Sequence, residues 1–370
     1  MKNLFTLSAI TALALSSLGA QAQFTVDGTL SAGEVGTGTG KYQLLGTYTN
    51  AHSATDRGLK SIYMGTTSTT LNIMVVASPE KSDYNAMLMY LDMPNKTGAP
   101  ANVALPAGSD NSSQFRSTPT LDMQADFGFR LTASPLGGND LNAYHSKIDY
   151  TLPRNGAGQA PDVYLGSTDK QGNAFTVTDP ASGIVGAKVS FKTSPTGSVA
   201  SNTTTGWEIE YPLSVLGGAV NTNLIRVMVA YVGDNADFSS DVLPQIAGQV
   251  NALGANPNFA NIAGNQFYTY QVGTGVLASR NAAAELQTSA YPNPVAADSR
   301  LAYTVPAGAQ PVTVEVYNSL GQKALSLLNT TQATGKHELP LTALRQLAAG
   351  PYVVMLRVGS QQSSHRVVVE

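Results

Sequence analysis

Residues 187–192 read Ala-Lys-Val-Ser-Phe-Lys, a strict alternation of apolar and polar side chains. Successive side chains of a β-strand point to opposite faces, so the stretch is typical of a strand with one face in a core and one in solvent. Residues 126–131 repeat the alternation. Because turn-forming residues cluster between the short apolar runs, the sequence predicts a sandwich of antiparallel sheets. Further strands are expected over residues 71–77, 86–92, 207–211, 224–232 and 266–272.

The strand pattern is interrupted and then resumes near the C-terminus. Residues 276–288 are rich in small residues and lack a period, which indicates a linker. Two prolines in residues 291–294 then fix an extended path. Alternation returns after them, with strands expected over residues 301–305, 312–316, 352–358 and 366–369. The chain is therefore predicted to be all-β, with a large antiparallel β-sandwich over residues 23–275 and a smaller immunoglobulin-like β-sandwich over residues 289–370.

The first 22 residues have the three parts of a signal peptide. Met1-Lys2 gives a positive start, an apolar run follows, and Ala20-Gln21-Ala22 offers a small-residue cleavage site. The run is too short to span a bilayer comfortably, so we expect cleavage after Ala22 rather than a membrane anchor. No later stretch has 18 consecutive apolar residues, and no transmembrane segment is expected after cleavage.

Composition narrows the functional classes. Charged residues make up 12% of the chain, against about 25% in ordinary soluble domains. The net charge is -3, and loss of Lys2 with the signal peptide makes it -4, so we expect no nucleic-acid partner. The chain has no cysteine, which excludes disulfides, thiolate catalysis and cysteine-based zinc sites.

The C-terminal module resembles the type A C-terminal sorting domain of proteins exported by type IX secretion. The residues that carry the resemblance are Tyr291, Pro292, Asn293, Pro294, Asn318, Gly321, Gly350 and Tyr352, followed by the basic and apolar residues 365–369. The resemblance implies export in two steps, first into the periplasm and then across the outer membrane by the type IX machinery. The protein is then expected in the medium or on the outer cell surface. An ordinary immunoglobulin-like spacer is the alternative.

The large domain resembles family 9 carbohydrate-binding modules and DOMON-like sandwiches. Three stretches carry this resemblance in the family's order: residues 26–30 (Val-Asp-Gly-Thr-Leu) with Glu34 soon after, residues 87–92, and residues 206–213. The resemblance implies an antiparallel sandwich of a kind that often binds glycans.

Aromatic residues are the first candidates for contact with a glycan, because sugar rings stack on exposed aromatic faces. Trp207 is the only tryptophan, but it shares a strand face with Ile209 and Tyr211, which equally fits a core position. The other candidates are three tyrosines expected on loops, Tyr144, Tyr164 and Tyr231.

Glu208 and Glu210 form the most obvious carboxylate pair. Two residues apart on a strand, they would lie about 7 Å from each other on one face. Glycosidases need a carboxyl group on each side of the scissile bond, which one strand face rarely supplies. We therefore interpret the pair as a solvated face of the strand.

One loop has the composition of a calcium site. Its oxygen-bearing side chains are Asp234, Asn235, Asp237 and Asp241. The same residues are common in turns without metal, so both interpretations stay open. No other cofactor is expected, since the four histidines have no metal-binding spacing.

Together these features predict a secreted or cell-surface, non-catalytic binding protein, with polysaccharide as its ligand. A structural or adhesive surface protein without a small ligand is the first alternative. A glycoside hydrolase is the second, and it would require acidic residues converging in a cleft.

Deletion of residues 289–370 should trap the protein in the periplasm, because the resemblance makes this module the outer-membrane address. Cell fractionation with an antibody against the large domain measures the distribution. Surface or medium delivery of the truncated chain at the level of the intact protein would contradict the sorting assignment.

Overall fold

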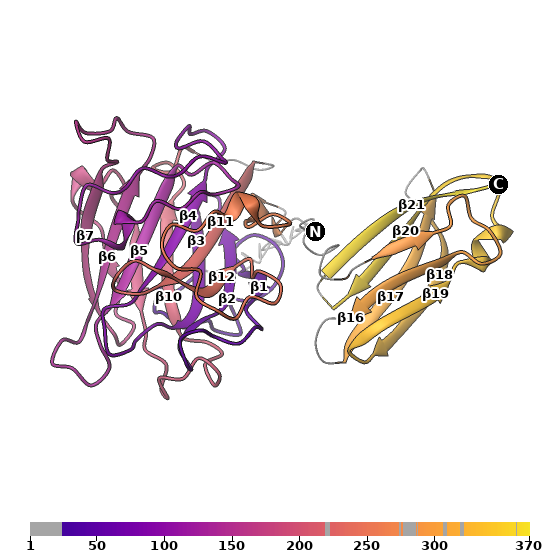
Figure 1. Cartoon of the computed structure of the whole chain (residues 1–370), viewed down its shortest axis with the longest axis horizontal. Helices are drawn as coiled ribbons and strands as arrows, with labels where there is room; N and C mark the ends of the chain where they lie inside the picture. The colour runs from indigo at the N-terminus through magenta and orange to yellow at the C-terminus, as the bar shows by residue number, and fades with distance from the viewer. Residues whose placement is uncertain are drawn as a thin grey trace, which may run out of the picture.

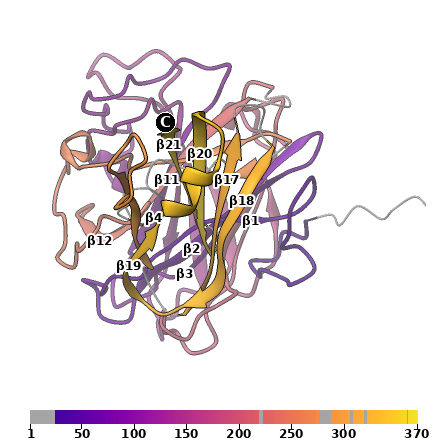
Figure 2. The same cartoon turned by 90° about the vertical axis from the view of Figure 1, so that its right-hand side faces the viewer.

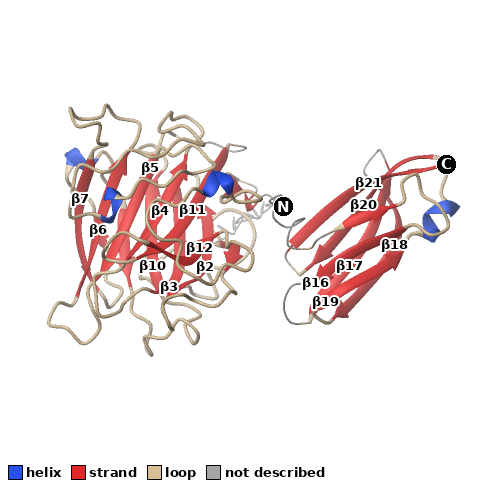
Figure 3. Cartoon of the chain, in the orientation of Figure 1, coloured by secondary structure: helices blue, strands red, loops and turns tan. Residues whose placement is uncertain are grey.

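The computed structural model describes residues 24–218, 223–273, 275–276, 286, 288–305, 309–318, 322–359 and 361–370. The predicted signal peptide and most of the predicted linker lie outside these residues. Regular structure in the described residues is almost all β-strand (Figure 3), which confirms the predicted fold class. None of the described helices is long and apolar enough to cross a membrane. The helices are the short 3-10 segments η1 (Gln114–Arg116), η2 (Pro180–Ser182), η3 (Phe259–Asn261) and η4 (Thr342–Gln346).

The larger lobe in Figure 1 is a sandwich of two antiparallel sheets, as predicted. The first sheet has the strand order β1-β2-β3-β10-β9-β8, with bounds β1 (Gln43–Thr47), β2 (Gly58–Thr66), β3 (Thr70–Ser78), β8 (Phe175–Thr176), β9 (Lys188–Phe191) and β10 (Gly206–Pro212). The second has the order β14-β13-β11-β4-β5-β6-β7, and β12 also pairs with β11. Its bounds are β4 (Ala86–Asp92), β5 (Phe127–Ala133), β6 (Asn142–Asp149), β7 (Asp162–Asp169), β11 (Leu224–Val232), β12 (Phe238–Leu243), β13 (Tyr268–Gln271) and β14 (Gly275–Val276).

The core of this sandwich is formed by one face of each sheet. Phe127, Phe129 and Leu131 of β5 lie in the same apolar cluster as Trp207 and Tyr211 of β10. The rings of Phe129 and Tyr211 are 4.5 Å apart between centroids. The alternation in the sequence thus identifies the inward face of these strands correctly.

The outer faces of both sheets are covered as well. Leu88 and Tyr90 of β4 pack in a second cluster with Phe115 and Phe259, which come from the two loops that cross this sheet. On the other sheet, Phe24 and other residues of the N-terminal segment pack on the outer face of β3 in a cluster of their own. The large sandwich therefore has three apolar layers.

Glu208 does not lie on a solvated face, so that prediction is wrong. Its side chain is fully buried, with Oε2 accepting the backbone N–H groups of Asp27 and Gly28 and Oε1 accepting the hydroxyl of Tyr42, all at 2.8 Å. Gly28 has a φ of +67°, and a Cβ there would lie 2.8 Å from the backbone nitrogen of Lys192, so the turn requires glycine. The Glu208 carboxyl group thus holds the N-terminal segment against the outer face of the sheet through these hydrogen bonds.

The smaller lobe is a second sandwich, of three and four antiparallel strands (Figures 1 and 2). Tyr303 of one sheet and Val314 and Leu356 of the other lie in its apolar core. The three-stranded sheet has the order β15 (Ser289–Tyr291), β16 (Arg300–Val305), β19 (Gly335–Pro340). The four-stranded sheet has the order β18 (Lys323–Gln332), β17 (Gln310–Asn318), β20 (Gly350–Val358), β21 (Gln361–Val369).

The Glu208 carboxyl predicts a pH dependence of stability. Burial raises its pKa from 4.5 to about 7, so as the pH rises through this window the unfolded chain loses the proton before the folded chain does. The free energy of unfolding should therefore fall between pH 5 and pH 8, by about 3 kcal/mol from this group alone.

The substitution Glu208→Gln should remove that contribution while keeping an acceptor for the two backbone N–H groups. Urea unfolding of the large sandwich at pH 5 and pH 8 measures the difference. The exposed Asp234→Asn serves as control and should leave the pH slope unchanged. An equal slope in Glu208→Gln and the unaltered chain would contradict the assignment.

Candidate functional site

Two of the four predicted ligand contacts are core residues. Trp207 is 1% exposed and Tyr231 is 2% exposed, and both belong to the cluster between the two sheets. The Tyr231 hydroxyl donates to the backbone carbonyl of Pro79. Neither ring presents a face to solvent, so the prediction that these two residues contact a ligand is wrong. The alternative given for Trp207, a position in the core, is correct.

The other two predicted contacts lie on the outer face of the larger sheet. They are strand residues rather than loop residues, with Tyr144 on β6 and Tyr164 on β7. Tyr164 pairs with Ser146, whose hydroxyl accepts a hydrogen bond from Arg130 on this outer face. Tyr144 is two residues from Ser146 along β6, so both tyrosines point outward. Tyr164 is 55% exposed at the edge of the sheet.

Asp140 connects Tyr144 to a third tyrosine. Its Oδ2 accepts the hydroxyls of Tyr144 at 2.8 Å and Tyr84 at 3.0 Å, and its Oδ1 accepts the backbone N–H of Asn142 at 3.0 Å. The rings of Tyr84 and Tyr144 lie 6.5 Å apart. We call Tyr84, Asp140, Tyr144 and Tyr164 the tyrosine surface.

The hydrogen bonds of Asp140 fix the orientation of two rings of the tyrosine surface. Burial alone would raise the pKa of Asp140, but hydrogen bonds from Tyr144, Asn142 and Tyr84 outweigh it and hold the pKa below its ordinary range. Asp140 is therefore ionised at neutral pH and a strong acceptor for both hydroxyls. The sequence analysis missed Asp140 and Tyr84. Asp140 lies four residues before Tyr144, across a turn, and this spacing could have indicated that the two side chains meet. No sequence signal points to Tyr84.

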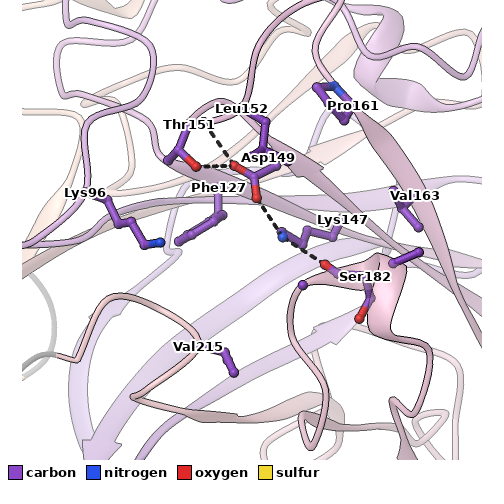
Figure 4. A pocket seen from close by; sticks show the side chains of 12 residues that line it. Lys96, Phe127, Lys147, Asp149, Thr151, Leu152, Pro161, Val163, Ser182 and Val215 are labelled. Atoms are coloured by element: carbon purple, nitrogen blue, oxygen red, sulfur yellow. Dashed lines mark hydrogen bonds and ion pairs between the residues drawn. The ribbon is translucent and has the colours of Figure 1, made fainter.

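A cavity of about 250 Å³ opens on the opposite face of the same strands (Figure 4). The ring of Phe127 forms one of its walls, and Lys147 Nζ lies 5.0 Å from the ring centroid. Lys147 donates to Asp149 Oδ2 at 2.8 Å and to the carbonyl of Ser182 at 2.9 Å. Leu152, half exposed, lines the cavity as well. We call this the Phe127 cavity. Sequence reasoning did not identify it.

The four residues of the proposed calcium loop are not brought together. Asp241 lies on β12, where its buried carboxylate is bonded to His52 Nδ1 at 2.6 Å and accepts the backbone N–H of Leu59 at 3.0 Å. Asn235 and Asp237 bond each other instead, and Asp234 is exposed. Across the residues that the structure describes, no three His, Asp or Glu side chains form a group able to hold a metal ion.

The sorting motifs, although far apart in sequence, meet in the small sandwich. Asn293 donates from Nδ2 to the carbonyl of Arg366 at 3.1 Å and accepts the backbone N–H of Val368 at 2.8 Å. The carbonyl of Pro292 accepts the hydroxyl of Ser299. The segment that begins the module thus holds its last strand, β21.

The other residues of the sorting motifs make local contacts, are exposed, or lie outside the described residues. Tyr291 ends β15 and is 47% exposed, and Pro294 is exposed as well. Asn318 accepts the backbone N–H of Gln322 at 3.0 Å and so links the end of β17 to the residue before β18. Gly350 begins β20, and the Tyr352 hydroxyl donates to the carbonyl of Ala348. Gly321 lies outside the described residues.

Comparison with known proteins identifies this module. Residues 289–370 match the family described as "Secretion system C-terminal sorting domain". No curated protein matches the chain. The solved structures that match include two crystal structures of the trimeric ectodomain of the C. elegans fusion protein EFF-1, one of them a mutant. They are 7% and 9% identical, cover 91% of this chain and 98% and 96% of their own chains, and have a TM-score of 0.15, which carries no argument.

The small sandwich is a C-terminal sorting domain of type IX secretion, in agreement with the resemblance in the sequence. The protein is therefore exported across the outer membrane to the cell surface or the medium, with the type IX machinery as its partner.

The substitution Asn293→Ala should loosen β21, since it removes both hydrogen bonds to that strand, worth about 1 kcal/mol each. Hydrogen exchange at the backbone N–H of Val368 should become faster. The control is Asn329→Ala, which alters an exposed asparagine of β18. Unchanged exchange at Val368 in the Asn293 variant would show that the motif does not hold the strand.

Proposed function

We propose that the large sandwich is a non-catalytic carbohydrate-binding domain, carried to the cell exterior by the sorting domain. The observation that carries the proposal is the tyrosine surface, which groups Tyr144 and Tyr164 on the outer face of the sheet with Tyr84 from the loop before β4. Aromatic rings offer apolar faces to the C–H groups of sugars, and their polar edges suit a wet site. The resemblance of residues 26–30 and 206–213 to carbohydrate-binding modules agrees with this function.

The arrangement of the tyrosine surface suits a polymer rather than a small free sugar. Tyr164 stands at the sheet edge, and Tyr144 and Tyr84 follow across the same face. Tyr84 is 39% exposed and Tyr164 is 55% exposed, so a chain that lies over the surface can reach both rings. Because Asp140 already holds two of the rings, little side-chain freedom is lost on binding.

The two carboxylates considered for catalysis are engaged in contacts within the chain. Glu208 is buried under the N-terminal segment with both oxygens occupied. Glu210 is largely buried and paired with Lys188 at 2.8 Å. A general acid and its partner must reach a substrate from both sides of a bond, and neither group is placed to do so.

The substitution Tyr164→Ala should weaken binding of the recognised polysaccharide about three- to tenfold, because one stacking face is lost. Affinity electrophoresis of the chain from residue 23 against a panel of neutral and acidic polysaccharides, with calcium and with chelator, measures the retardation. Tyr291→Ala, which removes an exposed tyrosine of the sorting domain, is the matched control.

Retardation that is lost in Tyr164→Ala but kept in Tyr291→Ala supports the proposal. Absence of retardation by every polymer would refute carbohydrate binding. It would favour a structural or adhesive surface protein, for which self-association measured by light scattering is the next observation.

A further inference from the structure

The Phe127 cavity has the composition of a binding site separate from the tyrosine surface. It lies on the inward side of β5, β6 and β7, whereas the tyrosines point outward from the same sheet. Its lining combines an aromatic ring, the exposed aliphatic side chain of Leu152 and the charged groups of Lys147 and Asp149. Apolar walls with a few fixed polar groups are typical of ligand sites.

The charged pair in the cavity is ordered by the protein itself. Asp149 Oδ1 accepts the backbone N–H of Thr151 at 3.0 Å and its hydroxyl at 2.6 Å, while Oδ2 accepts Lys147. Both carboxylate oxygens of Asp149 thus accept hydrogen bonds from donors of the chain itself. Lys147 has three N–H donors, and its two hydrogen bonds to Asp149 and Ser182 leave the third for a ligand.

A second cation is not neutralised. Lys96 Nζ lies 5.8 Å from the centroid of the Phe127 ring, and Figure 4 shows the two lysines on either side of that ring. Within the described residues, Lys96 has no carboxylate close enough for an ion pair. The adjacent cavity of about 340 Å³ also includes Lys96, together with Arg226, whose charge is paired with Asp92. Of the two lysines that line the Phe127 cavity, Lys96 is therefore the one without an ion-pair partner among the described residues.

We propose that the Phe127 cavity binds an anionic sugar residue, either a uronate or a sulfated hexose. Lys96 and the third N–H of Lys147 bind the carboxylate or sulfate group, and the half-exposed side chain of Leu152 contacts the apolar side of the ring. The inference rests on the proposed carbohydrate binding and adds the charge class of the ligand. Without residues 1–22 the chain has a net charge of -4, which opposes unspecific attraction to polyanions, so binding of an acidic polymer requires a local site.

The test compares acidic polymers with their neutral forms. Affinity electrophoresis of the chain from residue 23 uses polygalacturonate and its methyl ester for the carboxylate, and dextran sulfate and dextran for the sulfate. At least one acidic polymer should bind about five- to tenfold more tightly than its neutral form, as expected for one partly desolvated charge contact. The two pairs of polymers distinguish the two anions.

Substitutions of single lysines then show whether the preference for the acidic polymer depends on the Phe127 cavity. Lys96→Gln should reduce binding of the acidic polymer to the level of the neutral one, and Lys96→Arg should retain most of it. Lys81→Gln removes the same charge from an exposed position outside the cavity and should change nothing. Because Lys96 is only half buried and holds no ion pair, its replacement should leave the fold intact, which circular dichroism checks.

Equal affinity for acidic and neutral polymers would overturn the inference, as would an equal loss in the Lys96 and Lys81 variants. The failure of this inference is distinct from failure of carbohydrate binding itself. Retardation by a neutral polymer that depends on Tyr164 and not on Lys96 would preserve the proposed function and remove only the anionic site.

Discussion

Both sheets of the large sandwich bury apolar side chains on their outer faces as well as between them. Strand β4 shows this most clearly, since all of its seven residues are buried. A chain without cysteine gains stability from such additional burial. The arrangement requires long covering segments, which explains why so much of the large domain is loop. It also determines where a ligand can reach a sheet, namely where the cover ends.

The cover ends near the β6–β7 edge. Phe115 packs beside Tyr90, with a ring separation of 6.2 Å, and Gly128 leaves room for it on β5. Nearer the start of β6, Tyr144 emerges only half buried, and Tyr164 on the last strand is more exposed. The tyrosine surface is thus the portion of the outer face that the loops leave uncovered.

The sequence predicted strands β3, β4, β5, β9, β10, β11 and β13 of the large sandwich. It missed others, such as β2, β6, β7 and β12, and it did not show which outer faces are covered. Alternation placed Phe127, Phe129 and Leu131 in the core correctly. It also assigned Glu208 to solvent, because local pattern does not show that a segment 180 residues earlier covers that face. Strands β18 and β19 of the small sandwich were not predicted, and polar residues interrupt the alternation in both.

The candidate sites were predictable only in part for the same reason. Tyr144 and Tyr164 could be selected by residue type, whereas Trp207 and Tyr231, selected in the same way, are buried. The Phe127 cavity joins three strands with η2 and the segment around Val215. Its members share no sequence motif, so only the tertiary structure brings them together.

The two proposed sites and the sorting domain are far apart in the order of the strands. Strand β14, the last before the sorting domain, lies at one edge of the eight-stranded sheet, and β7 lies at the other. Tyr164 and Val163, which belong to the tyrosine surface and the Phe127 cavity, are both on β7. Both proposed sites thus include a residue of the edge strand that is farthest from β14 in the strand order. Removal of that domain would leave both sites complete, since neither includes a residue beyond β11.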